Sequence, residues 1–284
     1  MTARKKIILG SALVALVGGV AWELWRLRIP DPIYDGHPLS YWFEEGHGPM
    51  SGNAAVGEQI TDAVRHVGTN AIPLLLHFMR ARDSALKRRL IMLADSQSFI
   101  RCRIVSEEGR HNQAEWGFEA LGSDGASAVP ELMRVYQMNL SLDSQRSVIE
   151  ALGCIGPGAR LAIPLLIDAA TNSAVEMRSC ASLALGQVRL EPDVVVPVLT
   201  NCLHDPYLEV RAYALQALGD FGPQAESAVP LLLGLLTANL PVKNESFLPV
   251  PQLDRVSVEE ALIKIDPVAA ANAGIQMTNA SPTQ

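Results

Sequence analysis

Two stretches of this 284-residue chain are nearly the same. Residues 149–166 read IEALGCIGPGARLAIPLL, and residues 215–232 read LQALGDFGPQAESAVPLL. Internal similarity at a fixed period is typical of repeat architectures, in which each unit buries its apolar face only against its neighbours. The repeat restricts the possible folds more than any other feature of the sequence.

Two landmarks recur in phase along the chain. Ala-Leu-Gly occurs with spacings of 31, 33 and 33 residues, at 120–122, 151–153, 184–186 and 217–219. A β-branched residue followed by Pro, any residue and Leu recurs with its prolines at Pro73, Pro130, Pro164, Pro197 and Pro230. Apolar residues between the landmarks follow helical spacing, which predicts two helices per unit. In the unit at 205–222, Asp205 and Pro206 are expected to start a helix, and Gly219 and Gly222 to end it.

The units resemble HEAT repeats, with Pro-x-Leu in the first helix and Val-Arg-x-x-Ala-x-x-Ala-Leu-Gly in the second. The residues that match the second-helix pattern best are Val210, Arg211, Ala214, Ala217, Leu218 and Gly219. The resemblance covers about 110–238, and 52–96 more loosely. It implies an all-α fold, an α-solenoid of stacked helix pairs. The segment YDGHPLSYWFEEG also resembles the part that precedes the repeats in some membrane-anchored bacterial HEAT-like proteins.

The repeats predict the following organisation. Residues 29–51 form a linker with a short amphipathic helix, and residues 52–270 form the solenoid. The prolines Pro73 and Pro130 are 57 residues apart, which indicates an irregular insertion at about 97–110, a long loop or an extended helix end. A Pro-rich loop is expected at about 241–254, and a disordered tail at 271–284.

Residues 1–28 carry a basic head followed by an uncharged apolar run from Ile7 to Trp22. We expect a single transmembrane or signal-anchor helix, with residues 7–25 in the membrane and Trp22 and Trp25 at the interface. The basic head then faces the cytoplasm, which predicts a single-pass protein of a bacterial inner membrane with its C-terminal body in the periplasm. If residues 1–21 are instead cleaved as a signal peptide, the body is periplasmic or secreted.

Charge is distributed unevenly along the chain. Residues 111–284 carry 9 basic and 19 acidic side chains, a net charge of −10 that repels a phosphate backbone, so no nucleic-acid partner is expected. Residues 80–110 are the exception, with 8 basic and 4 acidic side chains, and are interpreted as a solvated helix face. The four cysteines show no CxxC pairing and are interpreted as partly buried small hydrophobes.

The sequence predicts no catalytic, cofactor-binding or metal-binding residues. His37, Glu44, Glu45 and His47 are grouped, but their spacing matches no familiar metal site. A binding surface is the preferred hypothesis, because the second helices of stacked pairs line one extended face. Residues that step by three or four along these helices share that face. The predicted protein-binding residues are Glu150, Glu176, Glu209, Tyr213, Gln216 and Asp220.

The sequence therefore predicts a non-catalytic, membrane-tethered scaffold for protein partners with basic or partly apolar segments. An ordinary solvated helix face is the alternative explanation of the same residues. The runner-up function is a HEAT-like lyase or chaperone-type enzyme of the phycobilin lyase kind, since a fold does not decide a function. A third hypothesis, a DNA-repair glycosylase on a HEAT scaffold, needs a basic concave face that the charge pattern does not provide.

Overall fold

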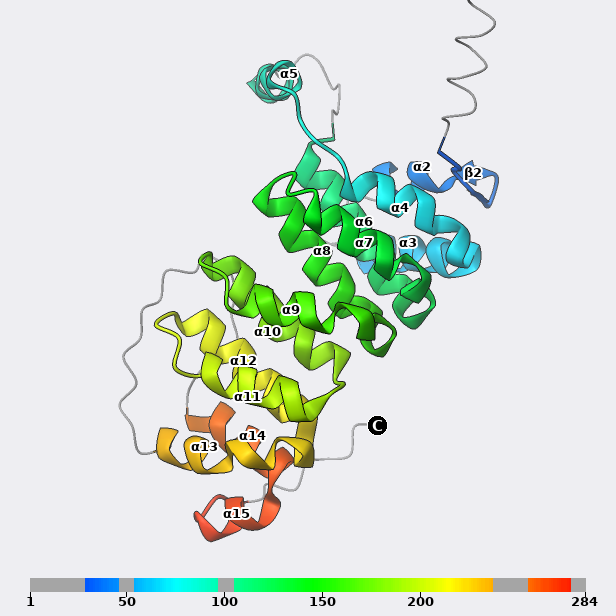
Figure 1. Cartoon of the computed structure of the whole chain (residues 1–284). Coiled ribbons are helices and arrows are strands. Elements are labelled where there is room, and N and C mark those ends of the chain that lie inside the picture. The colour runs from blue at the N-terminus through cyan, green and yellow to red at the C-terminus, as the bar shows by residue number, and fades with distance from the viewer. Residues whose placement is uncertain (1–28, 46–53, 97–104, 237–254, 277–284) are drawn as a thin grey trace, which may run out of the picture.

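The computed structural model describes residues 29–45, 54–96, 105–236 and 255–276. Within these ranges the chain is almost entirely helical (Figure 1), which confirms the predicted all-α class. The predicted membrane segment at 7–25 and the Pro-rich loop at 241–254 lie outside the described residues, as do residues 277–284 of the predicted tail.

A short hairpin opens the described chain. Strands β1 (Ile33–Tyr34) and β2 (His37–Pro38) pair antiparallel around Asp35 and Gly36, whose φ angles of 46° and 78° fit a two-residue hairpin turn. Helix α2 (Leu39–Glu45) follows, within residues 29–51, for which the sequence predicts a linker with a short amphipathic helix. Its Leu39 and Phe43 are buried in the core, so this segment packs onto the helices and does not simply connect them.

The helices alternate between two kinds. Each first helix of a pair begins with a β-branched residue or has Pro within its first turn; these are α4 (Ile72–Met79), α7 (Val129–Gln137), α9 (Ile163–Ala170), α11 (Pro192–Cys202) and α13 (Val229–Leu235). The second helices are α6 (Glu107–Leu121), α8 (Leu142–Ile155), α10 (Val175–Val188), α12 (Leu208–Phe221) and α14 (Arg255–Ile265). Each second helix contacts the next one, and α3 (Ala54–Val67) precedes the pairs and contacts α6.

Proline and glycine set the bounds of these helices. The Pro of most first helices sits at their first or second position, where its missing N–H costs no hydrogen bond. Three second helices end at a glycine with positive φ, namely Gly122, Gly156 and Gly222 at 50°, 66° and 56°. Short 3₁₀ turns η3 (Gly122–Ala128), η4 (Gly156–Ala162) and η5 (Gly222–Ala228) then lead into the next first helix.

Two details of the predicted helix ends are wrong. Asp205 is not the N-cap of α12, because Tyr207 occupies that position and Asp205 lies two residues before it. Gly219 does not stop α12 but lies inside it, buried, where a side chain would meet Ala261 of α14. Gly186 of α10 is closer still, because an added Cβ would lie 2.6 Å from the Cβ of Ala217. Small residues therefore permit close approach of consecutive second helices.

Part of the surplus between Pro73 and Pro130 forms a separate helix, α5 (Ala85–Ser96), between α4 and α6. In Figure 1, α5 stands away from the other helices. The predicted insertion at 97–110 extends too far, because α6 begins at Glu107. Two hydrogen bonds join the residues just before α5 to the start of α6. Asp83 N–H donates to Glu107 Oε2 at 2.7 Å, and Glu107 N–H donates to Asp83 Oδ2 at 3.0 Å.

The last described helix is α15 (Pro267–Asn272), which runs two residues past the predicted end of the repeats at 270. Asp266 caps it by accepting hydrogen bonds from the backbone N–H groups of Val268 at 3.0 Å and Ala269 at 2.9 Å. Ala270 and Ile275 are buried, so this end of the chain covers the apolar flank of α14.

One stretch of the described residues, Leu142–Ala170, is long and apolar enough to cross a membrane by length and composition alone. It consists of α8, η4 and α9, and 56% of its apolar window is buried inside the protein. Its apolar side chains are core residues of the helix pairs, so this length and composition need no membrane to explain them.

Candidate binding surface

The second helices place equivalent positions side by side. The residue six positions before the C-cap is Trp116 in α6, Glu150 in α8, Leu183 in α10 and Gln216 in α12. Because these four helices contact one another in order, the equivalent side chains follow one line across the layer. We call the face that contains this line the second-helix face.

The six predicted binding residues lie on three of these helices. Glu176 and Gln216 are exposed, whereas Glu150, Glu209, Tyr213 and Asp220 are half-buried. Half-burial between adjacent helices holds these side chains in fewer conformations than a freely solvated residue has. Shifting Tyr213 back by two 33-residue repeats predicts that Ser147 of α8 also lies on this face. That prediction is wrong, because Ser147 is fully buried.

Glu150 is the best-connected of the predicted residues. Its carboxylate accepts two hydrogen bonds from Arg146 Nη1 at 2.9 and 3.0 Å, one turn earlier on α8. The Cys180 thiol of α10 lies 3.2 Å from Glu150 Oε1 and donates to it. Glu150 thus joins α8 to α10, and its position is fixed before any partner binds.

Glu115 of α6 was not among the predicted residues. Burial, followed by the nearby Glu150 carboxylate, raises the pKa of Glu115 to about 8, and the carboxyl is therefore protonated at neutral pH. Glu115 shares this buried site with the Ser147 hydroxyl and the Glu150 carboxylate of α8, and the hydrogen bond with Ser147 offsets part of the rise in pKa. The repeat did not reveal Glu115, because it is one residue away from the equivalent position, which is Trp116.

Negative charge also gathers at the other end of the surface. Burial and the neighbouring Glu176 raise the pKa of Glu209 above its ordinary value. Burial and Glu209 raise the pKa of Tyr213 in turn, so its phenol stays neutral and donates hydrogen bonds at physiological pH. An approaching cation would relieve the repulsion between Glu176 and Glu209.

A pocket of about 260 Å³ extends the second-helix face onto α3 and α6. Its lining consists of Gly57, Ile60, Thr61, Arg65, Trp116, Glu119 and Ala120. Trp116 and Ala120 stand six and two residues before the cap glycine, as Gln216 and Asp220 do in α12. Continuing the repeat register by one more unit toward the N-terminus would have found both residues.

The cysteines and histidines of the described residues form no metal site. No three His, Cys, Asp or Glu side chains come together as a ligand set in this part of the chain. His37 instead stacks on Tyr41 with ring centroids 4.3 Å apart. Cys154 and Cys180 are half-buried and Cys202 is buried, which agrees with their interpretation as partly buried hydrophobes. Burial, helped by nearby carboxylates, raises the pKa of Cys154 to about 12.

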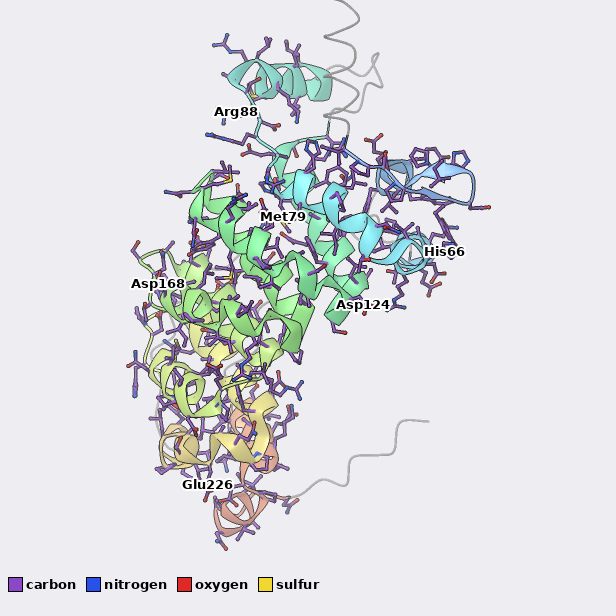
Figure 2. All side chains as sticks on the ribbon, turned by 45° about the vertical axis from the view of Figure 1, so that its right-hand side comes forward. His66, Met79, Arg88, Asp124, Asp168 and Glu226 are labelled. Carbon is purple, nitrogen blue, oxygen red and sulfur yellow. The ribbon has the colours of Figure 1, made fainter. Side chains whose placement is uncertain are left out.

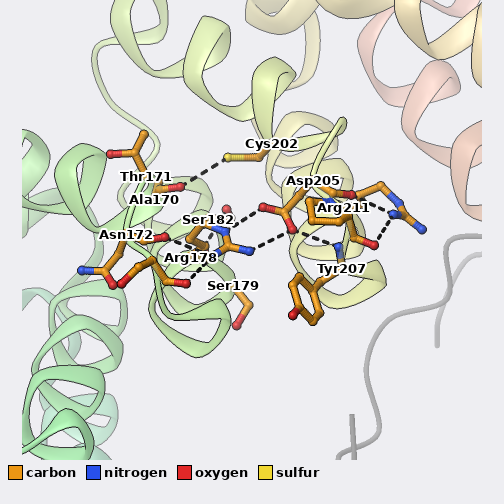
Figure 3. A network of polar contacts seen from close by, with 12 residues as sticks. Ala170, Thr171, Asn172, Arg178, Ser179, Ser182, Cys202, Asp205, Tyr207 and Arg211 are labelled. Carbon is orange, nitrogen blue, oxygen red and sulfur yellow. Dashed lines mark hydrogen bonds and ion pairs between the residues drawn. The ribbon is translucent and has the colours of Figure 1, made fainter. Parts of the chain in front are cut away.

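The arginine of the second-helix pattern has a structural task (Figure 3). Arg178 Nε and Nη2 donate to the two carboxylate oxygens of Asp205 at 2.7 and 3.1 Å, and Asp205 also accepts from Tyr207 N–H at 2.9 Å. Arg178 Nη1 donates to the carbonyls of Asn172 and Ser173. The next unit repeats part of this pattern, because Arg211 Nη1 donates to the carbonyls of Asp205 and Pro206. These contacts fix the loops between helices and leave the second-helix face free for other uses.

The comparisons with known proteins agree with this arrangement. The family model described as HEAT repeat matches residues 195–225, which contain most of α11, all of α12 and the start of η5. No curated protein matches the chain. The matched segment includes Val210, Arg211 and Ala214, on which the sequence resemblance rests. Together with the helix pairs, this match supports the prediction that the chain is a HEAT-repeat protein.

Proposed function

We propose that this protein is a non-catalytic scaffold whose helix pairs stack as an α-solenoid and whose second-helix face binds a protein partner. HEAT repeats commonly mediate protein–protein interactions, and the family match supports that role here. The observation that carries the proposal is the line of equivalent positions from Trp116 to Gln216, which gives four consecutive helices one shared surface.

The chemistry of that surface defines the partner. Four of the six predicted residues are carboxylates, and Glu209 with Glu176 forms a site of mutual repulsion that a positive charge would relieve. Tyr213 offers a neutral aromatic ring beside them, and the pocket at Trp116 has room for an apolar side chain. The proposed partner is therefore a protein segment that carries basic residues and at least one large apolar residue.

We further propose that residues 7–25 anchor the protein in a bacterial inner membrane, with the repeats on the exported side. The basic residues before Ile7 support this orientation, and Trp22 and Trp25 support the position of the span. Export would restrict partners to periplasmic proteins or the periplasmic parts of membrane proteins. Protease accessibility in intact and in permeabilised cells tests the orientation, and digestion of the repeats in sealed spheroplasts is the expected result.

A photo-crosslinking amino acid at Gln216, an exposed position of the second-helix face, tests the binding surface in intact membranes. Crosslinks to a discrete partner are expected, and Glu209→Lys with Asp220→Lys should abolish them. The matched control reverses Asp168 and Glu226, two exposed carboxylates on α9 and η5 (Figure 2), and should leave the crosslinks unchanged. Crosslinks that survive reversal of Glu209 and Asp220 would contradict the proposed surface.

The lyase alternative has no observation in its favour among the described residues, and the HEAT match does not favour it.

A further inference from the structure

Helix α5 exposes an unusual number of large apolar side chains. The exposed fractions are 68% for Leu86, 45% for Leu90, 65% for Met92 and 56% for Leu93. Every other described helix exposes at most one such side chain. Single exposed apolar residues are normal on protein surfaces, but a contiguous group of them marks an interaction site.

The sequence of α5 gathers three of these four residues on one side, whereas Met92 lies on the other side, near Arg88. At 3.6 residues per turn, Leu86, Leu90 and Leu93 fall within an arc of about 60°. Arg89 borders this arc, and Arg88 lies on the opposite side of the helix. Lys87 forms an ion pair with Asp83 at 2.5 Å, which connects the first turn of α5 to the residues just before the helix. The helix therefore combines an apolar face with exposed arginines, the pattern of helices that lie in a membrane interface.

The position of α5 in the molecule also indicates that this helix contacts a membrane. Figures 1 and 2 place α5 at the end of the molecule that also carries the β1–β2 hairpin, opposite to α15. The described chain begins there at Ile29, four residues after Trp25. Four extended residues span at most about 14 Å. If residues 7–25 cross the bilayer, this end of the protein must face the bilayer surface.

We propose that α5 lies in the interface of an anionic phospholipid bilayer, with Leu86, Leu90 and Leu93 among the acyl chains and with arginines near the phosphates. Charge decides between a lipid surface and a second apolar protein face. Arg82, Arg88 and Arg89 are all exposed, and an anionic lipid surface attracts each of them. The inference rests on the proposed membrane anchor only for the approach of this end of the molecule to the bilayer.

Hydrogen–deuterium exchange of the full-length chain in vesicles tests the inference. The vesicles contain phosphatidylcholine alone or with one third phosphatidylglycerol. Backbone amides of residues 85–96 are expected to exchange at least tenfold more slowly in the anionic vesicles. Leu86→Ala with Leu90→Ala keeps the helix propensity high and should remove this difference. Arg88→Gln with Arg89→Gln should reduce it at least fivefold, because each charge near the surface strengthens binding about fivefold. Val194→Ala with Val256→Ala, exposed positions on other helices, should change nothing.

Flotation of the same samples separates this inference from the anchor. Chain that floats with both kinds of vesicle and shows slow α5 exchange only in anionic ones supports both. Chain that floats only with anionic vesicles and is released by salt, with α5 protected, supports the α5 inference and contradicts the anchor. Floating chain whose α5 amides exchange freely contradicts the α5 inference alone, and chain that floats with neither contradicts both. Protection that rises with protein density in neutral vesicles would place a second copy on α5 and also overturn the inference.

Discussion

Replacement of Glu115 by Gln should stabilise the protein, and the gain should depend on pH. Glu115 keeps its proton in the folded state up to a pH of about 8, because burial and Glu150 raise its pKa from the ordinary value of 4.5. In the unfolded chain Glu115 is neither buried nor held close to Glu150, so it loses that proton near pH 4.5. Glutamine resembles the protonated carboxyl in shape and still donates a hydrogen bond, but it never requires a proton.

The pKa values determine the magnitude. Between pH 4.5 and 8 the folded state holds one more proton than the unfolded state, so the free energy of unfolding falls by about 1.4 kcal/mol per pH unit. At pH 7 the loss reaches at most about 3.4 kcal/mol relative to low pH. Relaxation and water entry reduce such penalties in real proteins, so we expect Glu115→Gln to gain about 1–2 kcal/mol at pH 7. Near pH 4.5 the gain should be close to zero.

Urea unfolding followed by far-ultraviolet circular dichroism at pH 5, 7 and 8.5 measures this dependence. The matched control is Glu119→Gln, one turn further along α6, where the carboxylate is exposed. It should change the unfolding free energy by less than about 0.5 kcal/mol at each pH. Equal gains for Glu115→Gln at pH 5 and 8.5, or a loss at pH 7, would refute the assignment of a protonated carboxyl beside Glu150.

Two further substitutions test how the pairs are held together. Asp205→Ala should lower the free energy of unfolding by about 3 kcal/mol, because Asp205 and Arg178 are only 10% and 13% exposed and Arg178 would lose its ion-pair partner. Glu191→Ala breaks the exposed pair with Arg160 and should cost less than about 1 kcal/mol in the same urea titration. Gly186→Ala should lower the melting temperature, with a free-energy cost of about 1–3 kcal/mol, because the new Cβ would overlap Ala217. Gly57→Ala, where a Cβ meets no atom within 4 Å, should raise the melting temperature slightly, and the reverse order of these two variants would contradict the packing between α10 and α12.

The helix pairs were predictable because their signals are local. A proline in a first turn and a glycine at a C-cap act through the backbone of their own segment, so Pro164 and Gly156 mark helix bounds without knowledge of the tertiary fold. The hairpin had a local signal as well, in the Asp-Gly dipeptide at Asp35, which the prediction did not use.

The remaining features depend on contacts between units. Ser147 was expected on the surface because Tyr213 is its equivalent, but it lies beside Glu115 of α6 and is buried there. The prediction assumed that equivalent positions in successive repeats are buried to the same extent. That assumption fails here, because the side chains that surround the equivalent positions differ in size. Asp205 was predicted to cap a helix because it directly precedes Pro206 and a helical pattern. Its side chain instead accepts a hydrogen bond from Arg178, which is 27 residues away in the sequence. No pattern within one unit contains such a contact.

Neighbouring units contact one another in order, so the separation between Trp116 and Asp220 depends on every interface between them. A small rotation at each interface adds to the next, and the separation of the two ends changes much more than any single contact does. A ligand that touches both ends would therefore select one curvature from a continuous range. The length of the bound segment, and not only its charge, would then decide which partners fit.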